Sequence, residues 1–293
     1  MITDIERPLR GIAMVCLGVI GFAMADVFTK LLVDGLPVPY IMAVRYVVSV
    51  VLFLVLIGPQ RRKGVFRANA PKLVLLRGVI LTAGSLCMGI ALMTIPVGEA
   101  TAIIYLSPIA VMILAIPVLG ERVTALGWLG AAVGFLGVLL IVRPSGGLDP
   151  FGVLMALINA VCATFYHLMT RYLAKTERPS TLMIYTLVVG SVGFVGISFG
   201  DIFEHTPSIT QWLMMIGLGA TATVGHFLIT LSYREAPASL LAPVNYVHIL
   251  FSAVASWIVF HHAPDLWTAI GMGCIAIAGA GIAVYSHFHK SRV

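Results

Sequence analysis

Long apolar segments alternate with short polar or turn-forming ones along almost the whole chain. About twenty consecutive apolar residues make one membrane-spanning helix, because the hydrocarbon core of a bilayer is about 30 Å thick and a helix rises about 1.5 Å per residue. Segments that meet this requirement are 11–31, 39–58, 71–93, 97–118, 124–142, 151–173, 180–200, 209–231, 237–260 and 266–287. The pattern therefore predicts an all-α integral membrane protein with ten transmembrane helices.

Composition supports this class. The 293 residues are 60% hydrophobic and 10% charged, whereas soluble domains have roughly 25% charged residues. The start, "MITDIERPLRG", leads directly into an apolar run without a cleavage-like site, so we expect a membrane helix there and not a removed signal peptide. The four cysteines lie inside apolar segments without metal-ligand spacing, so we expect no metal site, no cofactor and no disulfide framework.

Basic residues are distributed unevenly between the two sides that ten spans define. Lys30 and Arg143 fall on one side and Arg45 lies within a span, which leaves fifteen of the eighteen Lys and Arg residues at the ends and loops of the side that carries both termini. Basic residues concentrate on the cytoplasmic side of membrane proteins. The pattern predicts cytoplasmic N- and C-termini, and it explains the net charge of +6 without a nucleic-acid partner.

The chain repeats itself at an offset of 141 residues. Matching pairs run from the first span to the fifth without a gap, among them Gly11 with Gly152, Thr29 with Thr170, Gly84 with Gly225, Pro96 with Pro237 and Tyr105 with Tyr246. We expect two repeats, 1–147 and 148–293, and because five spans is an odd number the second repeat is inverted. Inverted repeats around a central cavity are typical of secondary transporters. A duplication that only enlarged a helical bundle is the alternative.

The run "GEATAIIYLSPIAVMILAIPVLGERVTALGWLGAAVGFLGVLLIVRP" at 98–144 resembles the EamA domain of the drug/metabolite transporter superfamily. The resemblance rests on Ser107-Pro108, the turn Gly120-Glu121-Arg122 and the glycine-rich segment that follows, and it extends over both halves. The second half departs from it, since His261-His262 stands where the first half has Gly120-Glu121.

The resemblance implies ten helices around a central cavity in a bacterial inner membrane, with cytoplasmic termini. Members of the family move amino acids, nucleotide sugars, vitamins or drugs. The most similar branch comprises exporters of aromatic and other amino acids, and riboflavin-type or S-adenosylmethionine-type carriers are the alternatives.

Motifs of enzymes are absent from the sequence: it has no HExxH, no GxSxG and no GxxxxGK[ST]. We therefore expect a carrier driven by a gradient. An intramembrane enzyme and a passive channel are the other classes, and each has its own signature. An enzyme converts its substrate in detergent, a carrier shows counterflow in liposomes, and a channel shows flux without exchange.

Polar side chains in the middle of apolar spans are the candidate substrate ligands. "VNYVH" at 244–248 supplies three of them, and its twin in the first repeat supplies two more. The candidates are Tyr105, Ser107, Asn245, Tyr246, His248, His226, Tyr166, His167, Met24 and Met88. Several donors and acceptors with few fixed charges suit a small neutral or zwitterionic molecule that has an apolar part. His226 fits a packing role equally well.

Charged residues inside or beside the spans are candidates for gating or coupling, because a charge within the bilayer is costly unless it faces a cavity or a partner. They are Asp26, Lys30, Arg45, Glu99 and Arg171. The alternatives are a structural ion pair for the first three and a helix-dipole contact for Glu99. We expect a small-molecule substrate and the lipid bilayer as partners, with the coupling ion left open between a proton and another ion. Small-residue runs such as Gly130–Gly134 allow a monomer or a weak homodimer.

Overall fold

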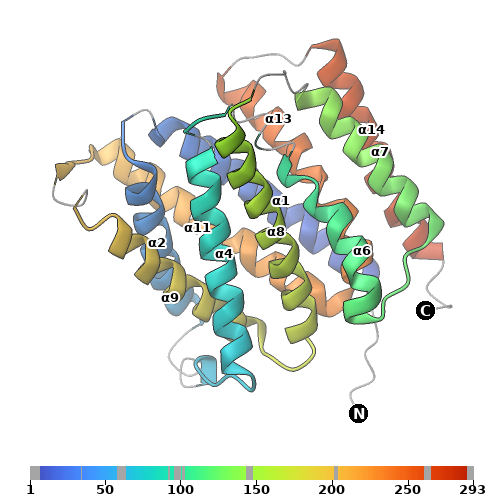
Figure 1. Cartoon of the computed structure of the whole chain (residues 1–293), viewed down its shortest axis with the longest axis horizontal. Coiled ribbons are helices and arrows are strands. Elements are labelled where there is room, and N and C mark those ends of the chain that lie inside the picture. The colour runs from blue at the N-terminus through green and yellow to red at the C-terminus, as the bar shows by residue number, and fades with distance from the viewer. Residues whose placement is uncertain are drawn as a thin grey trace.

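The computed structural model describes residues 7–33, 35–57, 64–91, 93–95, 100, 103–142, 148–200, 204–260 and 265–288. These residues form helices joined by short turns, with no strand among them (Figure 1). The helices are α1 (Pro8–Val33), α2 (Val38–Ile57), α4 (Pro71–Ala91), α6 (Ser107–Leu119), α7 (Ala125–Val142), α8 (Pro150–Leu173), α9 (Pro179–Ile197), α11 (Ile209–Glu235), α12 (Ala238–Val244), α13 (Val247–Phe260) and α14 (Leu266–Phe288).

Local sequence signals set several of these boundaries. α1, α4, α8 and α9 each begin at a proline, which is pre-organised for the first helical position and has no N–H to leave unpaired there. Asp149 caps α8 by accepting from the Gly152 N–H at 2.8 Å, and Ser208 forms a capping box with Gln211 at the start of α11. α6 ends at Gly120, whose φ of 68° lies in the left-handed region that glycine adopts without strain.

The described residues contain ten apolar helical segments, which confirms the predicted number of spans. Eight are at least 18 residues long and apolar enough to cross a membrane, counting α12 and α13 together, and two more are shorter. The shorter ones lie within α6 and α14.

The fourth and ninth spans are not the continuous helices that the sequence analysis expected. α12 ends at Val244 and α13 begins at Val247, so Asn245 and Tyr246 form a turn between them. In the first repeat a turn at Tyr105 and Leu106 precedes α6. The offset of 141 places Tyr105 on Tyr246, so the two breaks are equivalent.

A proline lies within three residues of each break, at Pro108 and at Pro243. Proline removes one helical N–H donor and crowds the preceding turn, which interrupts a helix. The predicted start of the fourth span, 97–102, lies outside the described residues except for Ala100.

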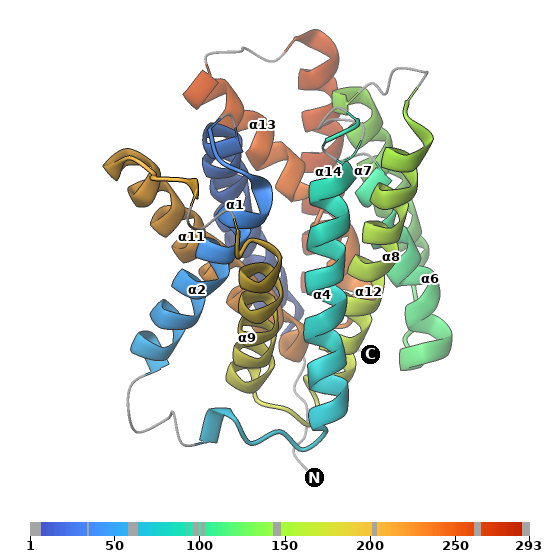
Figure 2. The same cartoon turned by 60° about the vertical axis from the view of Figure 1, so that its left-hand side comes forward.

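Helix packing follows the inverted repeat. The first repeat contributes α1, α2, α4, α6 and α7, and the second contributes α8, α9, α11, α12–α13 and α14. α1 packs on α11 as its counterpart α8 packs on α4, and α1 packs on α13 as α8 packs on α6 (Figure 2). α2 packs on α11 as its counterpart α9 packs on α4, and two further large contacts join equivalent helices, α2 with α9 and α7 with α14. Exchanging the repeats therefore reproduces the contact pattern, and the bundle consists of two inverted five-helix repeats.

α1 begins and α14 ends toward the same end of the bundle, which we call the terminal face; the other end is the opposite face (Figure 1). The end of α11 is held beside the start of α1, because the Arg7 N–H donates to the Glu235 carbonyl at 2.8 Å and Arg10 pairs with the Glu235 carboxylate at 3.5 Å. Thus α1, α4, α7, α9 and α12 start at the terminal face.

Small residues allow close packing inside the bundle. A methyl group on Gly137 of α7 would lie 2.7 Å from the Gly271 carbonyl oxygen of α14, and one on Gly134 would lie 2.5 Å from a ring carbon of Tyr246. The glycine-rich segment of α7 is therefore a packing seam with α14 and with the break before α13.

Candidate substrate cavity

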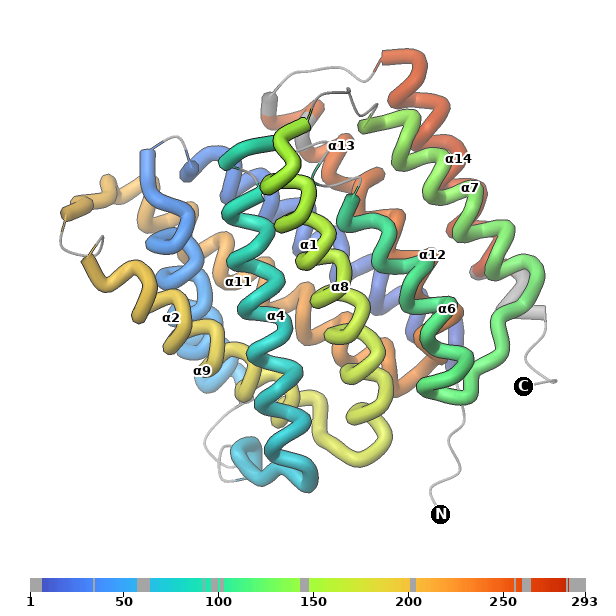
Figure 3. The backbone as a smooth tube through the Cα atoms, in the orientation of Figure 1, coloured from blue at the N-terminus to red at the C-terminus, as the bar shows by residue number. Residues whose placement is uncertain are grey.

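A cavity of about 150 Å³ lies between the two repeats, beside the middle of α1. Both helix breaks reach it, and α6 and α12 run side by side next to it (Figure 3). Its lining residues are Val19, Phe22, Ile104, Tyr105, Ser107, Pro108, Val111, Ala163, His167, Tyr233, Ala242, Asn245 and His248. The cavity thus brings together five residues that the sequence analysis selected, namely Tyr105, Ser107, His167, Asn245 and His248.

His248 connects the two repeats at this cavity. Its Nδ1 lies 2.6 Å from the Tyr105 hydroxyl, and its Nε2 lies 3.0 Å from the Asp26 carboxylate. Ser252, one turn further along α13, donates to the same carboxylate oxygen of Asp26 at 3.0 Å. Asp26 therefore contacts α13 through His248 and Ser252, and the imidazole of His248 joins it to the wall of the cavity.

Asp26 and His248 differ in how exposed their side chains are. The side chain of Asp26 is 57% exposed and that of His248 is 23% exposed. Because a carboxylate that faced hydrocarbon would be costly, we expect the exposed side of Asp26 to face a water-filled approach from the opposite face.

The other polar groups of the cavity are held by neighbours on the second repeat. Thr164 donates to the Ser107 hydroxyl at 3.2 Å, and the Tyr233 hydroxyl lies 2.9 Å from His167 Nδ1. The Asn245 amide donates to the carbonyl of Leu241, one turn back in α12, at 3.2 Å. These bonds fix the orientation of a hydroxyl, an imidazole and an amide around one space, and none of these groups carries an obligatory charge.

A buried ion pair lies between the cavity and the terminal face. Arg171 donates through Nε to the Glu121 carboxylate at 3.1 Å, and each side chain is 10% exposed. The same carboxylate accepts the N–H groups of Ala238 at 3.1 Å and Ser239 at 2.9 Å, the first two residues of α12. Arg171 also donates to the Tyr233 carbonyl at 2.8 Å. Glu121 thus caps α12 while pairing with α8, and together these bonds join both repeats on the terminal-face side of the cavity.

A second polar cluster, centred on Arg77, lies apart from the cavity. Arg77 lies in the second turn of α4 and is fully buried. Its guanidinium donates to acceptors on α8, α9 and α11, which are Thr170 Oγ1 (2.7 Å), the Leu182 carbonyl (3.0 Å), Thr186 Oγ1 (2.7 Å), the Tyr166 hydroxyl (2.9 Å) and Thr230 Oγ1 (3.3 Å). These bonds use its five N–H groups, so Arg77 ties four helices together.

Tyr166, His226 and Arg45 extend this cluster toward the opposite face. The Tyr166 hydroxyl lies 3.5 Å from His226 Nδ1, and Arg45 Nη2 lies 3.3 Å from His226 Nε2. Phe22 lies between the two polar regions, with its ring centroid 4.7 Å from that of His226 and 6.1 Å from that of His248. His226 is therefore separated from the cavity by one aromatic side chain, and Tyr166 lies behind His167, with ring centroids 5.4 Å apart.

The remaining predicted residues lie elsewhere. Tyr246 is 1% exposed and donates from its hydroxyl to the Tyr105 carbonyl at 3.2 Å, so it supports the wall of the cavity from behind. Met24 is 37% exposed and does not line the cavity, and Met88 packs against the cluster that contains Ala91 and Ile95. Lys30 is exposed near the end of α1, and Glu99 lies outside the described residues.

Two functional features escaped the sequence analysis. Glu121 was interpreted only as part of a turn motif, and Tyr233, which lines the cavity and bonds to His167, was not selected. Glu121 and Arg171 are fifty residues apart in the chain, and their pairing depends on the contact between the repeats. For Tyr233 a signal exists in the sequence: it lies seven residues after His226, two turns along the same face of α11.

Ten apolar helices, inverted repeats and a polar cavity between them define the class as a multi-pass membrane carrier. The sequence profile of the EamA-like transporter family matches residues 9–143 and 150–284. The chain therefore belongs to the EamA-like transporter family.

Individual relatives agree with this assignment over nearly the whole chain. The "Pseudopaline exporter CntI" of Pseudomonas aeruginosa is 26% identical, over 95% of this chain and 98% of the relative. A riboflavin transporter of Rhizobium johnstonii is 26% identical, over 93% of this chain and 90% of the relative. An S-adenosylmethionine uptake transporter of Rickettsia prowazekii is 24% identical, over 96% of this chain and 95% of the relative.

A solved crystal structure shares the fold, with a TM-score of 0.81 at 20% identity, and the match covers 97% of this chain and 98% of the other.

The family profile and the named relatives together define the function at the level of class. The protein is a transporter of small metabolites, and its substrate binds within the lipid bilayer.

Proposed function

We propose that the protein exports neutral amino acids, chiefly aromatic ones, across a bacterial inner membrane by alternating access. The observation that carries this proposal is the cavity between the repeats. Its polar groups are hydroxyls, an amide and imidazoles, and the rest of its wall is apolar; the polar groups come from Tyr105, Ser107, His167, Tyr233, Asn245 and His248. Such a lining suits a zwitterion with an apolar side chain better than a polyanion, which calls for several fixed cations.

Size also favours an amino acid. The cavity measures about 150 Å³, which is below the roughly 300–1,000 Å³ that is typical of pockets for drug-sized ligands. The alternative substrate is a vitamin or nucleoside-like metabolite, since relatives are named as riboflavin and S-adenosylmethionine transporters. Those larger molecules require a wider cavity than the one described.

Alternating access is supported by the different closure on the two sides of the cavity. Toward the terminal face, Glu121, Arg171 and the start of α12 are joined by buried bonds. Toward the opposite face, the polar connection ends at the exposed carboxylate of Asp26. When the bonds around Glu121 open and the region around Asp26 closes, the cavity becomes accessible from the terminal face instead of the opposite face. Inverted repeats permit this exchange.

The proposal also specifies the coupling ion, the orientation in the membrane and the oligomeric state. Asp26 and His248 form a route by which a proton reaches the cavity wall from water, so we propose proton coupling through this pair. The repeats are units 1–147 and 148–293, and the terminal face is cytoplasmic, which accords with the excess of basic residues on that side. The protein acts as a monomer or a weak homodimer, since the small-residue seam of α7 is used within the bundle.

Counterflow in liposomes tests the proposal. Purified protein is reconstituted with internal unlabelled substrate, and uptake of labelled phenylalanine, leucine, riboflavin or S-adenosylmethionine is followed with and without a pH gradient. We expect exchange of phenylalanine and leucine, and its loss in His248→Ala, with His205→Ala near the opposite face as the matched control. Exchange of riboflavin or S-adenosylmethionine alone establishes the alternative substrate. Flux without counterflow indicates a channel.

A further inference from the structure

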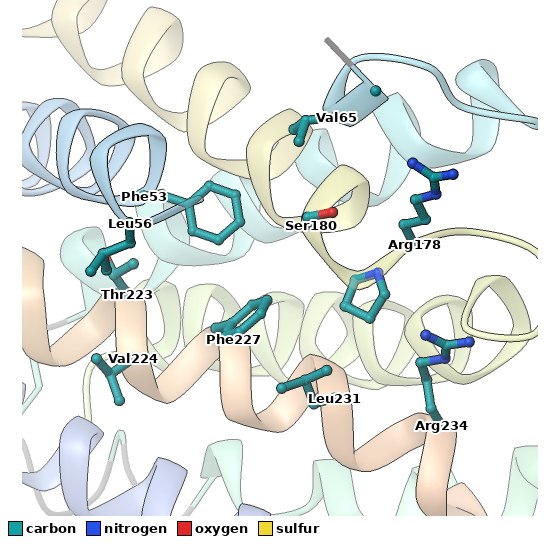
Figure 4. Close-up of a pocket in the computed structure, with 12 residues that line it drawn as sticks. Phe53, Leu56, Val65, Arg178, Ser180, Thr223, Val224, Phe227, Leu231 and Arg234 are labelled. Atoms are coloured by element: carbon teal, nitrogen blue, oxygen red, sulfur yellow. The ribbon is translucent and has the colours of Figure 1, made fainter. Parts of the chain in front are cut away.

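A second and larger pocket, of about 630 Å³, lies at the terminal face between α2, α9 and α11 (Figure 4). It is distinct from the cavity between the repeats, because the two share no lining residue. Most of its wall is apolar, with Phe53 and Leu56 from α2 and Val224, Phe227 and Leu231 from α11.

Positive charge is concentrated at one end of this pocket. Arg178, which immediately precedes α9, and Arg234, in the last turn of α11, both line it, and Figure 4 shows their guanidinium groups at the same end. Within the described part of the chain, neither side chain makes an ion pair or a hydrogen bond. No acidic residue is among those that line the pocket.

The start of α9 adds to this charge. Pro179 and Ser180, the first two residues of α9, line the pocket, and the N-cap residue supplies no side-chain cap. A helix N-terminus carries a partial positive charge and exposes N–H donors, so it attracts anions such as phosphate. The two guanidinium groups and the helix N-terminus therefore lie at the same end of the pocket.

The apolar part of the pocket extends away from this charged end into the membrane-spanning region. Thr223 and Arg234 both line it and lie eleven residues apart on α11, which corresponds to roughly 16 Å along the helix axis. Val224 is 49% exposed and Leu56 is 73% exposed, so the groove opens to the side of the bundle, where lipid surrounds the protein.

We propose that this pocket binds an anionic phospholipid. Its phosphate lies between Arg178 and Arg234 at the start of α9, and one acyl chain lies along the apolar groove between α2 and α11. A charged end at the level of the loops and an apolar end within the bilayer match an amphiphile that already resides in the membrane. α11 forms a wall of both spaces, with Phe227 in the lipid pocket and Tyr233 in the substrate cavity, so bound lipid is placed to influence transport.

Native mass spectrometry of the full-length protein in detergent measures this binding. Phosphatidylglycerol and phosphatidylcholine are titrated against the wild type and the variant Arg178→Gln/Arg234→Gln. We expect the wild type to retain phosphatidylglycerol preferentially, and the double variant to bind it about 30-fold more weakly, since each basic residue near a membrane surface contributes roughly fivefold. Lys72→Gln/Lys175→Gln is the matched control, because it removes two exposed charges from the same face but outside the pocket.

Further arms separate the lipid from other anions. Inorganic phosphate is added as a competitor, and Leu231→Trp narrows the groove without changing its charge. Weak competition by phosphate and weaker lipid binding in Leu231→Trp support the proposal. Equal binding by the arginine variant and the wild type overturns it, as does an equal loss in the lysine control. Full displacement by inorganic phosphate shows an ion site without an acyl chain. These outcomes do not depend on the substrate, so they leave the proposed function unaffected.

Discussion

At the scale of single residues, the carboxylates on either side of the cavity find their partners in the other repeat. Asp26 of the first repeat contacts His248 and Ser252 of the second, and Glu121 of the first contacts Arg171 of the second. Any motion that separates the repeats must break or rearrange these bonds. Such cross-repeat contacts are therefore where gating and coupling are best tested.

Asp26→Asn tests coupling. The amide keeps the size of the side chain but cannot carry a proton between water and His248. We expect uptake driven by a pH gradient to fall to the level without a gradient, while counterflow at equal pH persists; both are measured in liposomes. Asp149→Asn is the control, because it also removes a carboxylate yet asparagine still caps α8. Unchanged pH dependence in Asp26→Asn rules out its coupling role.

Glu121→Ala tests the buried ion pair. The substitution leaves Arg171 without its carboxylate and removes the cap of α12. Loss of one partner from a buried pair costs about 3–5 kcal/mol in the free energy of unfolding, which titration with a denaturing detergent measures. Glu235→Ala is the comparison, because its partner Arg10 has a 55% exposed side chain; exposed pairs contribute about 1 kcal/mol or less. Equal losses in the two variants would show that Glu121 has no special structural role.

At the scale of elements, broken helices and glycine seams determine how the cavity is built. The turns at Tyr105–Leu106 and Asn245–Tyr246 end one helical stretch and begin another within the membrane region. Tyr246 fits there because Gly134 of α7 leaves space for its ring. The seam of α7 therefore supports the cavity wall as well as the contact with α14.

Gly134→Ala tests this support. The added methyl group would lie 2.5 Å from a ring carbon of Tyr246, so the ring or the helix must shift. Overpacking of this kind costs about 1–3 kcal/mol in unfolding free energy, and displacement of Tyr246 should also weaken counterflow. The control is Gly281→Ala on α14, where a methyl group meets nothing within 4 Å and helix propensity favours alanine by about 1 kcal/mol. Similar stability of both variants would contradict the tight contact.

At the scale of the whole molecule, the inversion of the repeats determines the topology. Because both repeats contain five spans, α1 and α8 run in opposite directions and the chain returns to the face where it started. Both repeats line the candidate substrate cavity, and this arrangement is what allows access to alternate between the faces.

Reporter fusions test which face is cytoplasmic. We expect a fluorescent protein fused after Val293 to be fluorescent and a phosphatase fused there to be inactive, because phosphatase folds only outside the cytoplasm. A phosphatase fused after Pro207, between α9 and α11, should be active and serves as the matched comparison. The reverse pattern would place the termini outside and would exclude the proposed orientation.

Much of the architecture follows from the sequence. Ten spans, the offset of 141 residues and the expected EamA fold all agree with the structure. Five of the ten residues selected as substrate ligands line one cavity. Met24 and Met88 do not, because polarity and depth say nothing about which side of an apolar helix faces inward when nearly all its positions are hydrophobic.

The sequence by itself determined the membrane class, the number of spans and the repeat, because hydrophobic length and periodic similarity are local properties of the chain. Only the tertiary structure showed that Arg77 is buried, that Glu121 caps a helix of the other repeat, and that Asp26 meets His248 across 222 residues. Those facts depend on which helix faces pack together, and in a bundle surrounded by lipid that choice is made by steric fit and hydrogen bonding between distant segments.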